Sequence, residues 1–273
     1  MRFTHAALLG MYATGAYLGV KRRPELPFND PDFAPVHPTP VLYVHGFTSA
    51  TNTFTVNALH LRSHGYWVWG YDYGMEERAS LAAIIPVLHG FGDINALVQE
   101  LAGNVEKVKE ATGSDKVDIV AHSQGGLLTK LYIAGGGAEN VRRVVAIGAN
   151  FHGTDLGGWA ERVVPFIRRR PGIAEAVAST SALQQLVNSP FFDTIRDIPD
   201  TDPRVVYTSI YTPADRVVTP NSASYLESVD GADVVNVNLE EAYPGFAPVI
   251  HSLLPRDPNV AELTRWGLER GPS

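Results

Sequence analysis

Residues 117–126 constrain the fold more than any other part of this sequence. An apolar run ends abruptly at Ser123, and two small residues, Ala121 and Gly125, lie two positions before and two positions after it. This spacing is typical of a nucleophile elbow, a sharp turn between a strand and a helix that holds a reactive serine at the carboxyl edge of a parallel sheet. The turn brings backbones so close together that only small side chains fit at those two positions. Because a small-x-Ser-x-Gly string also arises by chance, the surrounding sequence has to support the prediction.

The residues on both sides of Ser123 fit such a turn. A β-type run precedes the serine, Gly126 opens a segment with helical spacing of apolar residues, and three glycines at 135–137 stop it. Similar patterns predict further strands at 41–44, 67–73, 141–149, 204–211 and 233–239. They predict helices at 51–64, at 257–268 and from an Asp93 cap to about Thr112. Strands that alternate with helices predict an α/β fold, a mostly parallel central sheet flanked by helices, with its ligand site beyond the carboxyl ends of the strands.

Length and composition favour one domain. A chain of 273 residues with 45% hydrophobic content can bury one substantial core. We predict a single domain over residues 1–273, with an N-terminal helix and proline-rich arm at 1–40 and a small helical cap insertion at 153–202, where the strand–helix alternation breaks. The net charge of −7 argues against a nucleic-acid partner, which would need a basic face. The absence of cysteine excludes thiol catalysis, disulfides and cysteine-ligated metals.

The N-terminal segment has two unusual parts. Residues 6–20 carry no charge, but they are too few to span a bilayer, so we predict no stable membrane insertion. Glycines inside this run and the basic residues 21–23 directly after it are untypical of a signal peptide. We expect a helix packed on the domain, with a signal remnant or truncated leader as the alternative, and the cellular compartment stays open. Residues 24–40 contain six prolines and predict an extended arm on the surface.

A serine nucleophile needs a base and an acid that orients the base. The expected chain order is serine, acid, histidine. Asp215 follows the predicted strand 204–211 across a short turn, and His251 follows the strand 233–239 and is the only histidine after His152. The alternatives are an ordinary turn aspartate stabilised by Arg216 and a surface-loop histidine. We predict that Ser123, Asp215 and His251 form a catalytic triad, and that His122, beside the serine, packs against the sheet.

Acyl transfer also needs hydrogen-bond donors for the oxyanion that develops on the substrate. We predict the backbone N–H groups of Gln124, directly after the nucleophile, and of Phe47, in the loop after the first strand, where Gly46 permits an unusual backbone. The alternative for this loop is a plain turn at a strand end. We expect no cofactor and no metal, because only His152 and Asp155 lie close enough in sequence to suggest ligands, and two are too few for a structural site.

Three stretches of the chain, residues 40–47, 115–126 and 215–220, resemble the small bacterial class 2 lipases of the α/β-hydrolase fold. The resemblance covers roughly residue 38 to the C-terminus. It implies an α/β-hydrolase fold, puts Ser123, Asp215 and His251 at the triad positions, and puts Phe47 and Gln124 at the oxyanion positions. The lack of cysteine departs from many relatives, which are exported and carry cysteines near the matching arm and cap.

These observations predict a serine carboxylic-ester hydrolase, a lipase or esterase that forms an acyl-enzyme on esters with apolar acyl chains. The cap at 153–202 is long enough for two or three short helices, and a few of its apolar side chains are expected to face an acyl pocket. The expected partner is a small-molecule or lipid ester, and the oligomeric state stays open. The alternatives are an acyltransferase that uses the same triad and a non-catalytic binding protein that kept the fold.

Overall fold

A computed structural model describes residues 27–74, 89–169 and 179–271 of the chain. Its centre is a six-stranded sheet in the order β2-β1-β3-β4-β5-β6, and every pair of neighbours runs parallel. The strands are β1 (Val41–Val44), β2 (Val68–Gly70), β3 (Val117–His122), β4 (Val141–Ile147), β5 (Val206–Tyr211) and β6 (Val234–Asn238). The predicted α/β fold with a parallel sheet is therefore confirmed.

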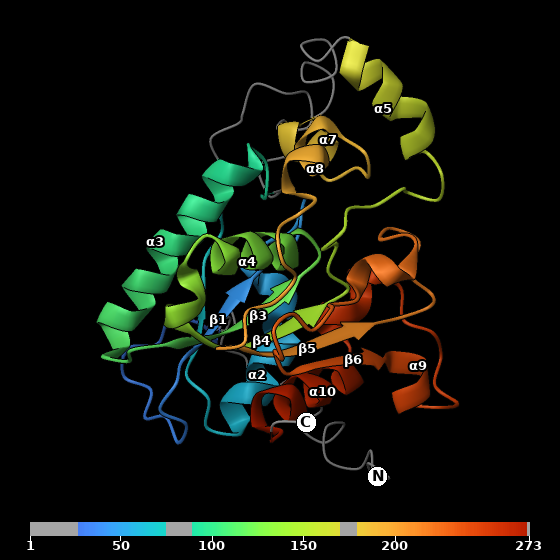
Figure 1. Ribbon diagram of the computed structural model, residues 1–273. Helices are drawn as coiled ribbons and strands as arrows, with labels where there is room; N and C mark the ends of the chain where they lie inside the picture. The colour runs from blue at the N-terminus through green and yellow to red at the C-terminus, as the bar shows by residue number, and fades with distance from the viewer. Residues whose placement is uncertain (1–26, 75–88, 170–178, 272–273) are drawn as a thin grey trace, which may run out of the picture.

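Helices cover both faces of this sheet (Figure 1). One face carries α3 (Ile94–Thr112) and α4 (Gln124–Ala134), and the other carries α2 (Thr55–Ser63) and α10 (Pro258–Glu269). The shorter elements are η2 (Thr51–Phe54), η4 (Gly137–Asn140), η5 (Asn221–Ser224), α9 (Leu239–Ala242) and η6 (His251–Arg256). The predicted helices at 51–64, 93–112 and 257–268 are therefore confirmed, the first of them as η2 followed by α2.

Side chains alternate between two hydrophobic cores along β1. Leu42 and Val44 enter the core beneath α3 and α4, whereas Val41 and Tyr43 enter the core beneath α2 and α10. The two-residue period of a strand produces this division, because successive side chains point to opposite faces of the sheet. Helices cover both faces, so β1 is apolar throughout instead of alternating with polar residues.

Local capping fixes where α3 begins and ends. The Asp93 carboxylate accepts hydrogen bonds from the backbone N–H groups of Asn95 and Ala96, at 2.9 and 3.3 Å. These bonds satisfy two of the amides that the first turn leaves without helical partners. The helix ends at Gly113, whose φ of 69° is the left-handed conformation that glycine adopts without strain.

The cap lies beyond the carboxyl edge of the sheet (Figure 1). Its described part contains α5 (Ala160–Arg169), α7 (Thr180–Gln184) and α8 (Pro190–Ile195), in line with the short helices predicted for 153–202. Val164, Ile167 and Leu186 form a small buried cluster of their own, which anchors this part of the cap. Trp159 and Phe166 are instead exposed on α5 or next to it. Residues 170–178 lie outside the described structure.

The prediction of a strand at 67–73 was too long, because β2 covers only Val68–Gly70. β1 offers few residues to pair with, and the last register pair joins Tyr43 to Gly70. Beyond it, Asp72 accepts a hydrogen bond from the Thr51 backbone N–H at 2.7 Å, and the Tyr73 hydroxyl donates to the His45 carbonyl at 2.6 Å. The chain after β2 therefore contacts the loop after β1 instead of continuing the sheet.

The arm follows the β2 edge of the sheet. No helix or strand occurs in its described part, residues 27–40, and Val36 N–H donates to the Gly65 carbonyl at 2.8 Å. The helix predicted at 6–20 lies outside the described residues, so the single domain over 1–273 stays a prediction. Within the described ranges, no helix has both the length and the apolar character needed to cross a membrane.

Candidate active site

Ser123 lies in a strained turn between β3 and α4. Its φ of 53° and ψ of −123° fall in a region that residues with a side chain rarely adopt. The close packing expected of a nucleophile elbow is present, because a Cβ on Gly125 would lie 2.3 Å from the Val44 carbonyl oxygen. A Cβ on Gly126 would lie equally close to the Cβ of Ala149. These contacts explain why small residues must follow the serine.

His251 links Ser123 to Asp215. The Ser123 Oγ lies 3.0 Å from His251 Nε2, and His251 Nδ1 lies 2.7 Å from Asp215 Oδ2. Because the carboxylate accepts the Nδ1 proton, Nε2 is left to accept the proton of the serine hydroxyl. The three side chains come from the ends of three segments, after β3, after β5 and at the start of η6. All three are buried, with exposed fractions of 8% for Ser123, 3% for Asp215 and 8% for His251.

The turn after β5 fixes the orientation of Asp215. Its Oδ1 accepts hydrogen bonds from the backbone N–H groups of Val217 and Val218, at 2.8 and 2.9 Å. These bonds leave Oδ2 directed at His251. In the described structure the Asp215 carboxylate contacts His251, and no salt bridge to Arg216 occurs, which argues against the alternative of an Arg216-stabilised turn aspartate.

His122 holds the backbone of His251 in place. Its Nε2 lies 3.2 Å from the His251 carbonyl oxygen, which can only accept, so Nε2 carries the proton. Burial lowers the pKa of His122 well below its usual value, and the neighbouring His251 lowers it further. His122 therefore stays neutral beside the triad. It is the last residue of β3, and its ring lies near the rings of Phe54 and His251.

The loop after β1 lies directly against the serine. A Cβ on Gly46 would be 2.9 Å from the Cβ of Ser123, so the loop could not approach so closely with a larger residue. His45 Nδ1 donates to the Gly46 carbonyl at 2.9 Å, and burial lowers the pKa of His45 to about 4, which keeps the imidazole neutral. The loop thereby holds Phe47 on the wall of the serine pocket, while Gln124 begins α4 on the other side of Ser123.

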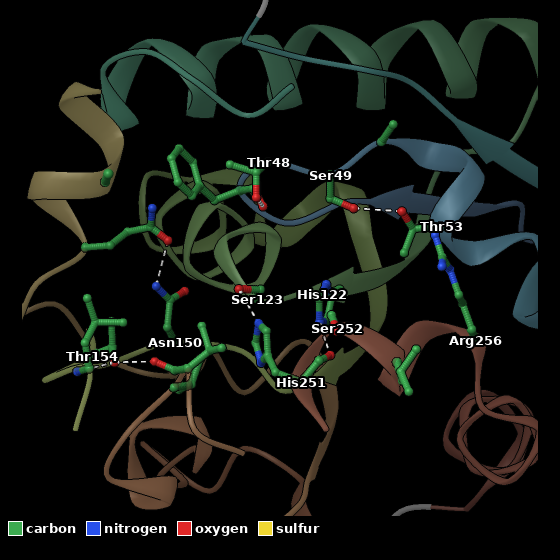
Figure 2. Close-up of a pocket in the computed structure, with 18 of the residues that line it drawn as sticks. Thr48, Ser49, Thr53, His122, Ser123, Asn150, Thr154, His251, Ser252 and Arg256 are labelled. Carbon is green, nitrogen blue, oxygen red and sulfur yellow. Dashed lines mark hydrogen bonds between the residues drawn. The ribbon is translucent and has the colours of Figure 1, made fainter. Parts of the chain in front are cut away.

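A pocket of about 650 Å³ opens over Ser123 and His251 (Figure 2). This volume is in the range of small-molecule sites. One wall, near Asn150 and Thr154, contains the apolar residues Leu186 and Val217, which contact Thr154. The opposite wall is more polar and contains Ser49, Thr53, Ser252 and Arg256 (Figure 2). The arrangement suits a molecule with an apolar part on one side of the serine and a polar part on the other.

Comparison with known proteins places this site in a family. The family model for class 2 lipases matches residues 38–235, which include Ser123 and Asp215. The chain belongs to the class 2 lipase family. The site therefore lies in an α/β-hydrolase fold, as the resemblance in the sequence implied.

The curated relatives of this chain are longer proteins. The chain is 24% identical over 151 residues to a triacylglycerol lipase of Pseudomonas fragi. The aligned region covers 55% of this chain and 47% of the relative. It is 30% identical over 128 residues to a triacylglycerol lipase of Pseudarthrobacter phenanthrenivorans, or 46% of this chain and 37% of the relative. The chain thus spans half or less of the length of these relatives.

Two solved structures share the fold of this chain. Aspergillus fumigatus lipase B superposes with a TM-score of 0.66 at 21% identity, over 86% of this chain and 53% of the other. The mature form of Bacillus licheniformis lipase BlEst2 superposes with a TM-score of 0.53 at 16% identity, over 77% of this chain and 86% of the other. At these identities the likeness concerns the fold alone.

The candidate metal-ligand pair is not brought together. His152 Nε2 lies 3.1 Å from Asp200 Oδ2, whereas Asp155 binds the hydroxyl of Thr219. Across the described ranges of the chain, no group of three or more His, Cys, Asp or Glu side chains could hold a metal ion.

Among the pocket residues that sequence reasoning did not single out are Asn150 and Gln185. Both are buried, and the Asn150 Nδ2 donates to Gln185 Oε1 at 2.8 Å. Asn150 directly follows the predicted strand 141–149, so its place at a strand end was a signal that could have marked it. Gln185 lies in the cap, where no local pattern marks it.

Proposed function

We propose that this chain is a serine carboxylic-ester hydrolase, a lipase or esterase that acts on esters with apolar acyl chains. The observation that carries the proposal is the hydrogen-bonded series from Ser123 through His251 to Asp215 in a pocket with an apolar wall. The names of the curated relatives, triacylglycerol lipases, point in the same direction. This chain contains the residue types that a serine hydrolase needs, in the order and at the distances it needs them.

In the first half of the reaction, Ser123 Oγ attacks the ester carbonyl carbon while His251 Nε2 takes the hydroxyl proton. Asp215 stabilises the imidazolium that forms and keeps Nδ1 protonated. The carbonyl oxygen becomes an oxyanion, which the backbone N–H groups of Phe47 and Gln124 stabilise. The tetrahedral intermediate collapses, the bond to the leaving alcohol breaks, and His251 returns the proton to that alcohol. Ser123 is left as an acyl ester.

In the second half, water replaces the alcohol. His251 takes a proton from the water as its oxygen attacks the acyl carbon, and the same N–H groups stabilise the second oxyanion. The bond to Ser123 Oγ breaks, the serine regains its proton from His251, and the carboxylic acid leaves. His122 contributes by position, because its neutral imidazole holds the His251 carbonyl without competing for the transferred proton.

The test is the hydrolysis of p-nitrophenyl esters from acetate to palmitate by the wild type and by Ser123→Ala. Ser123→Ala is expected to lower kcat by about 10⁴-fold or more, because Ser123 carries the hydroxyl that contacts His251 Nε2. A folded Ser123→Ala variant that retains most activity would contradict the proposal. The chain-length optimum of the wild type decides between an esterase and a lipase. Product partition in the presence of an added alcohol separates hydrolysis from acyl transfer.

A further inference from the structure

A series of buried side-chain amides runs from the nucleophile elbow to the pocket wall. Gln124 Nε2 donates to the Gly90 carbonyl at 2.9 Å, and Gln124 Oε1 accepts from Gln185 Nε2 at 2.6 Å. Gln185 Nε2 also donates to the Ser181 carbonyl at 3.0 Å, and Gln185 Oε1 accepts from Asn150 Nδ2 at 2.8 Å. Three amides from α4, the cap and the end of β4 are thus joined in one chain.

Contacts with backbone carbonyl groups fix the positions of the nitrogen and the oxygen in each side-chain amide. The carbonyl oxygens of Gly90 and Ser181 can only accept, so the nitrogens of Gln124 and Gln185 must face them. Gln185 Oε1 then faces Asn150 and requires a donor, which only the Asn150 nitrogen supplies. The orientation of the Asn150 amide therefore follows from the backbone contacts of Gln124 and Gln185. The Asn150 Oδ1 is the one oxygen of this amide series that faces none of the other amides.

The Asn150 Oδ1 is a buried acceptor without a partner. Only 2% of the Asn150 surface is exposed, and among the described residues no donor lies within hydrogen-bonding distance of Oδ1. A buried polar atom left in this way costs free energy, and such atoms in native structures call for an explanation. Asn150 lines the pocket, and Figure 2 shows its Oδ1 on the side that faces Ser123, away from the bond to Gln185.

The position of His251 decides which part of an ester meets Asn150. The leaving oxygen must receive its proton from His251 Nε2, and two residues of the polar wall, Ser252 and Arg256, belong to η6, the same element as His251. The alcohol part of the ester therefore extends along η6. The acyl part extends along the opposite wall, which contains Leu186, Val217 and Asn150.

We propose that Asn150 Oδ1 accepts a hydrogen bond from a hydroxyl group on the acyl chain, which makes esters of short hydroxyalkanoic acids the preferred substrate class. The inference rests on the proposed ester hydrolysis and specifies its substrate. A site built to bind a hydroxyl discriminates strongly against an analogue without the donor, because its own buried acceptor then stays unpaired. Leu186 and Val217 on the same wall accommodate the rest of the acyl chain.

The experiment compares three p-nitrophenyl esters, 3-hydroxybutyrate as separate enantiomers, 3-methoxybutyrate and butyrate. The methoxy ester keeps the oxygen and replaces the donor hydrogen with a methyl group, while butyrate lacks the donor without adding bulk, so a hydroxyl preference must appear against both. We expect the wild type to hydrolyse one hydroxy enantiomer with a kcat/KM about 10- to 100-fold above that of the methoxy ester. A ratio near one for both enantiomers overturns the inference, while hydrolysis of butyrate and labelling by a fluorophosphonate show that the proposed function still stands. Failure with every ester and with the probe overturns the proposed function itself.

Two variants locate the preference. Asn150→Leu keeps the approximate volume and removes the acceptor, so the hydroxy-to-methoxy ratio is expected to fall to near one. Asn52→Ala removes another asparagine that lines the same pocket and is expected to leave the ratio unchanged. A ratio retained in Asn150→Leu overturns the inference. General damage to the triad lowers kcat/KM for both esters alike, so it leaves the hydroxy-to-methoxy ratio unchanged. If Asn150→Leu does not fold, the wild-type ratio alone still shows whether the enzyme prefers the hydroxy ester.

A further comparison tests the placement on the acyl side. 2-Hydroxyethyl butyrate and 2-methoxyethyl butyrate carry the same difference on the alcohol. The wild type is expected to treat these two esters alike within about threefold, because the alcohol lies along η6 and away from Asn150. A hydroxyl preference on the alcohol that disappears in Asn150→Leu overturns the assignment of the two walls.

Discussion

Gly125→Ala tests the packing that places the nucleophile. The new Cβ would lie 2.3 Å from the Val44 carbonyl oxygen and 2.8 Å from that of His45, and an ordinary contact begins at 3.4 Å. Both obstacles are backbone atoms at the end of β1, so no side chain can rotate out of the way. The start of α4 and the end of β1 must therefore separate by about 1 Å, a displacement that moves Gln124 relative to Phe47.

The two proposed oxyanion donors lie on the two elements that separate, Gln124 at the start of α4 and Phe47 in the loop after β1. A shift of about 1 Å in a catalytic group costs on the order of 100-fold in rate, or about 2.7 kcal/mol. Overpacking costs a further ~1–3 kcal/mol of folding stability, which lowers the Tm of a chain of this size by about 3–10 °C. The assays are kcat/KM with p-nitrophenyl butyrate and thermal unfolding followed by circular dichroism.

Gly103→Ala is the matched control. Gly103 lies within α3, and a Cβ there meets no atom within 4 Å. The substitution is expected to leave kcat/KM unchanged and to raise stability by about 0.5–1 kcal/mol, because alanine favours a helix over glycine. If Gly125→Ala behaves like Gly103→Ala, with wild-type Tm and kcat/KM, the reasoning about the close approach of α4 and β1 is refuted.

Three further predictions concern charge. Asp215→Asn should lower kcat by about 10⁴-fold with unchanged circular dichroism, because His251 loses the carboxylate that selects its tautomer; a kcat within tenfold of wild type contradicts this. The pKa of His45 is about 4 in the folded state, against 6.5 for an unperturbed imidazole. Between these pH values the unfolded state therefore binds more protons than the folded state. The free energy of unfolding should decrease as pH falls from about 6.5 to 4. Urea titrations at both pH values measure the decrease, and a decrease of the same size in His45→Asn would show that His45 is not its source. Lys130→Met leaves Asp200 without its 2.7 Å buried cation and should cost about 3 kcal/mol in urea unfolding, part of which the double variant with Asp200→Leu recovers; equal stabilities of the single and double variants contradict a buried-charge penalty.

Local signals were enough to predict the elements of the fold. Asp93 as a cap, the apolar spacing that follows it and Gly113 after Thr112 specify α3 within a few residues, because each acts on the backbone next to it. β2 was less accurate, since its length depends on how many residues β1 offers for pairing. That number is a property of the sheet and not of the segment itself.

The site residues also divide into those that local sequence indicates and those that depend on the assembled fold. Ser123 stands out because its turn demands small neighbours in sequence, and chain order in this fold then directs attention to Asp215 and His251. The role of Asn150 depends on amides at positions 124 and 185 and on the carbonyls of Gly90 and of Ser181 in α7. These groups meet only after the cap has folded over the sheet, so no spacing in the sequence indicates them.

The central claim is that Ser123 is the nucleophile, and the most direct measurement is peptide mass mapping after reaction with a fluorophosphonate probe. Ser49 and Ser252 line the same pocket and serve as internal controls. The account predicts one adduct per chain, on the peptide that contains Ser123, with no labelling of Ser123→Ala or of heat-denatured protein. An adduct on Ser49 or Ser252, or no adduct on a folded wild-type chain, would contradict it.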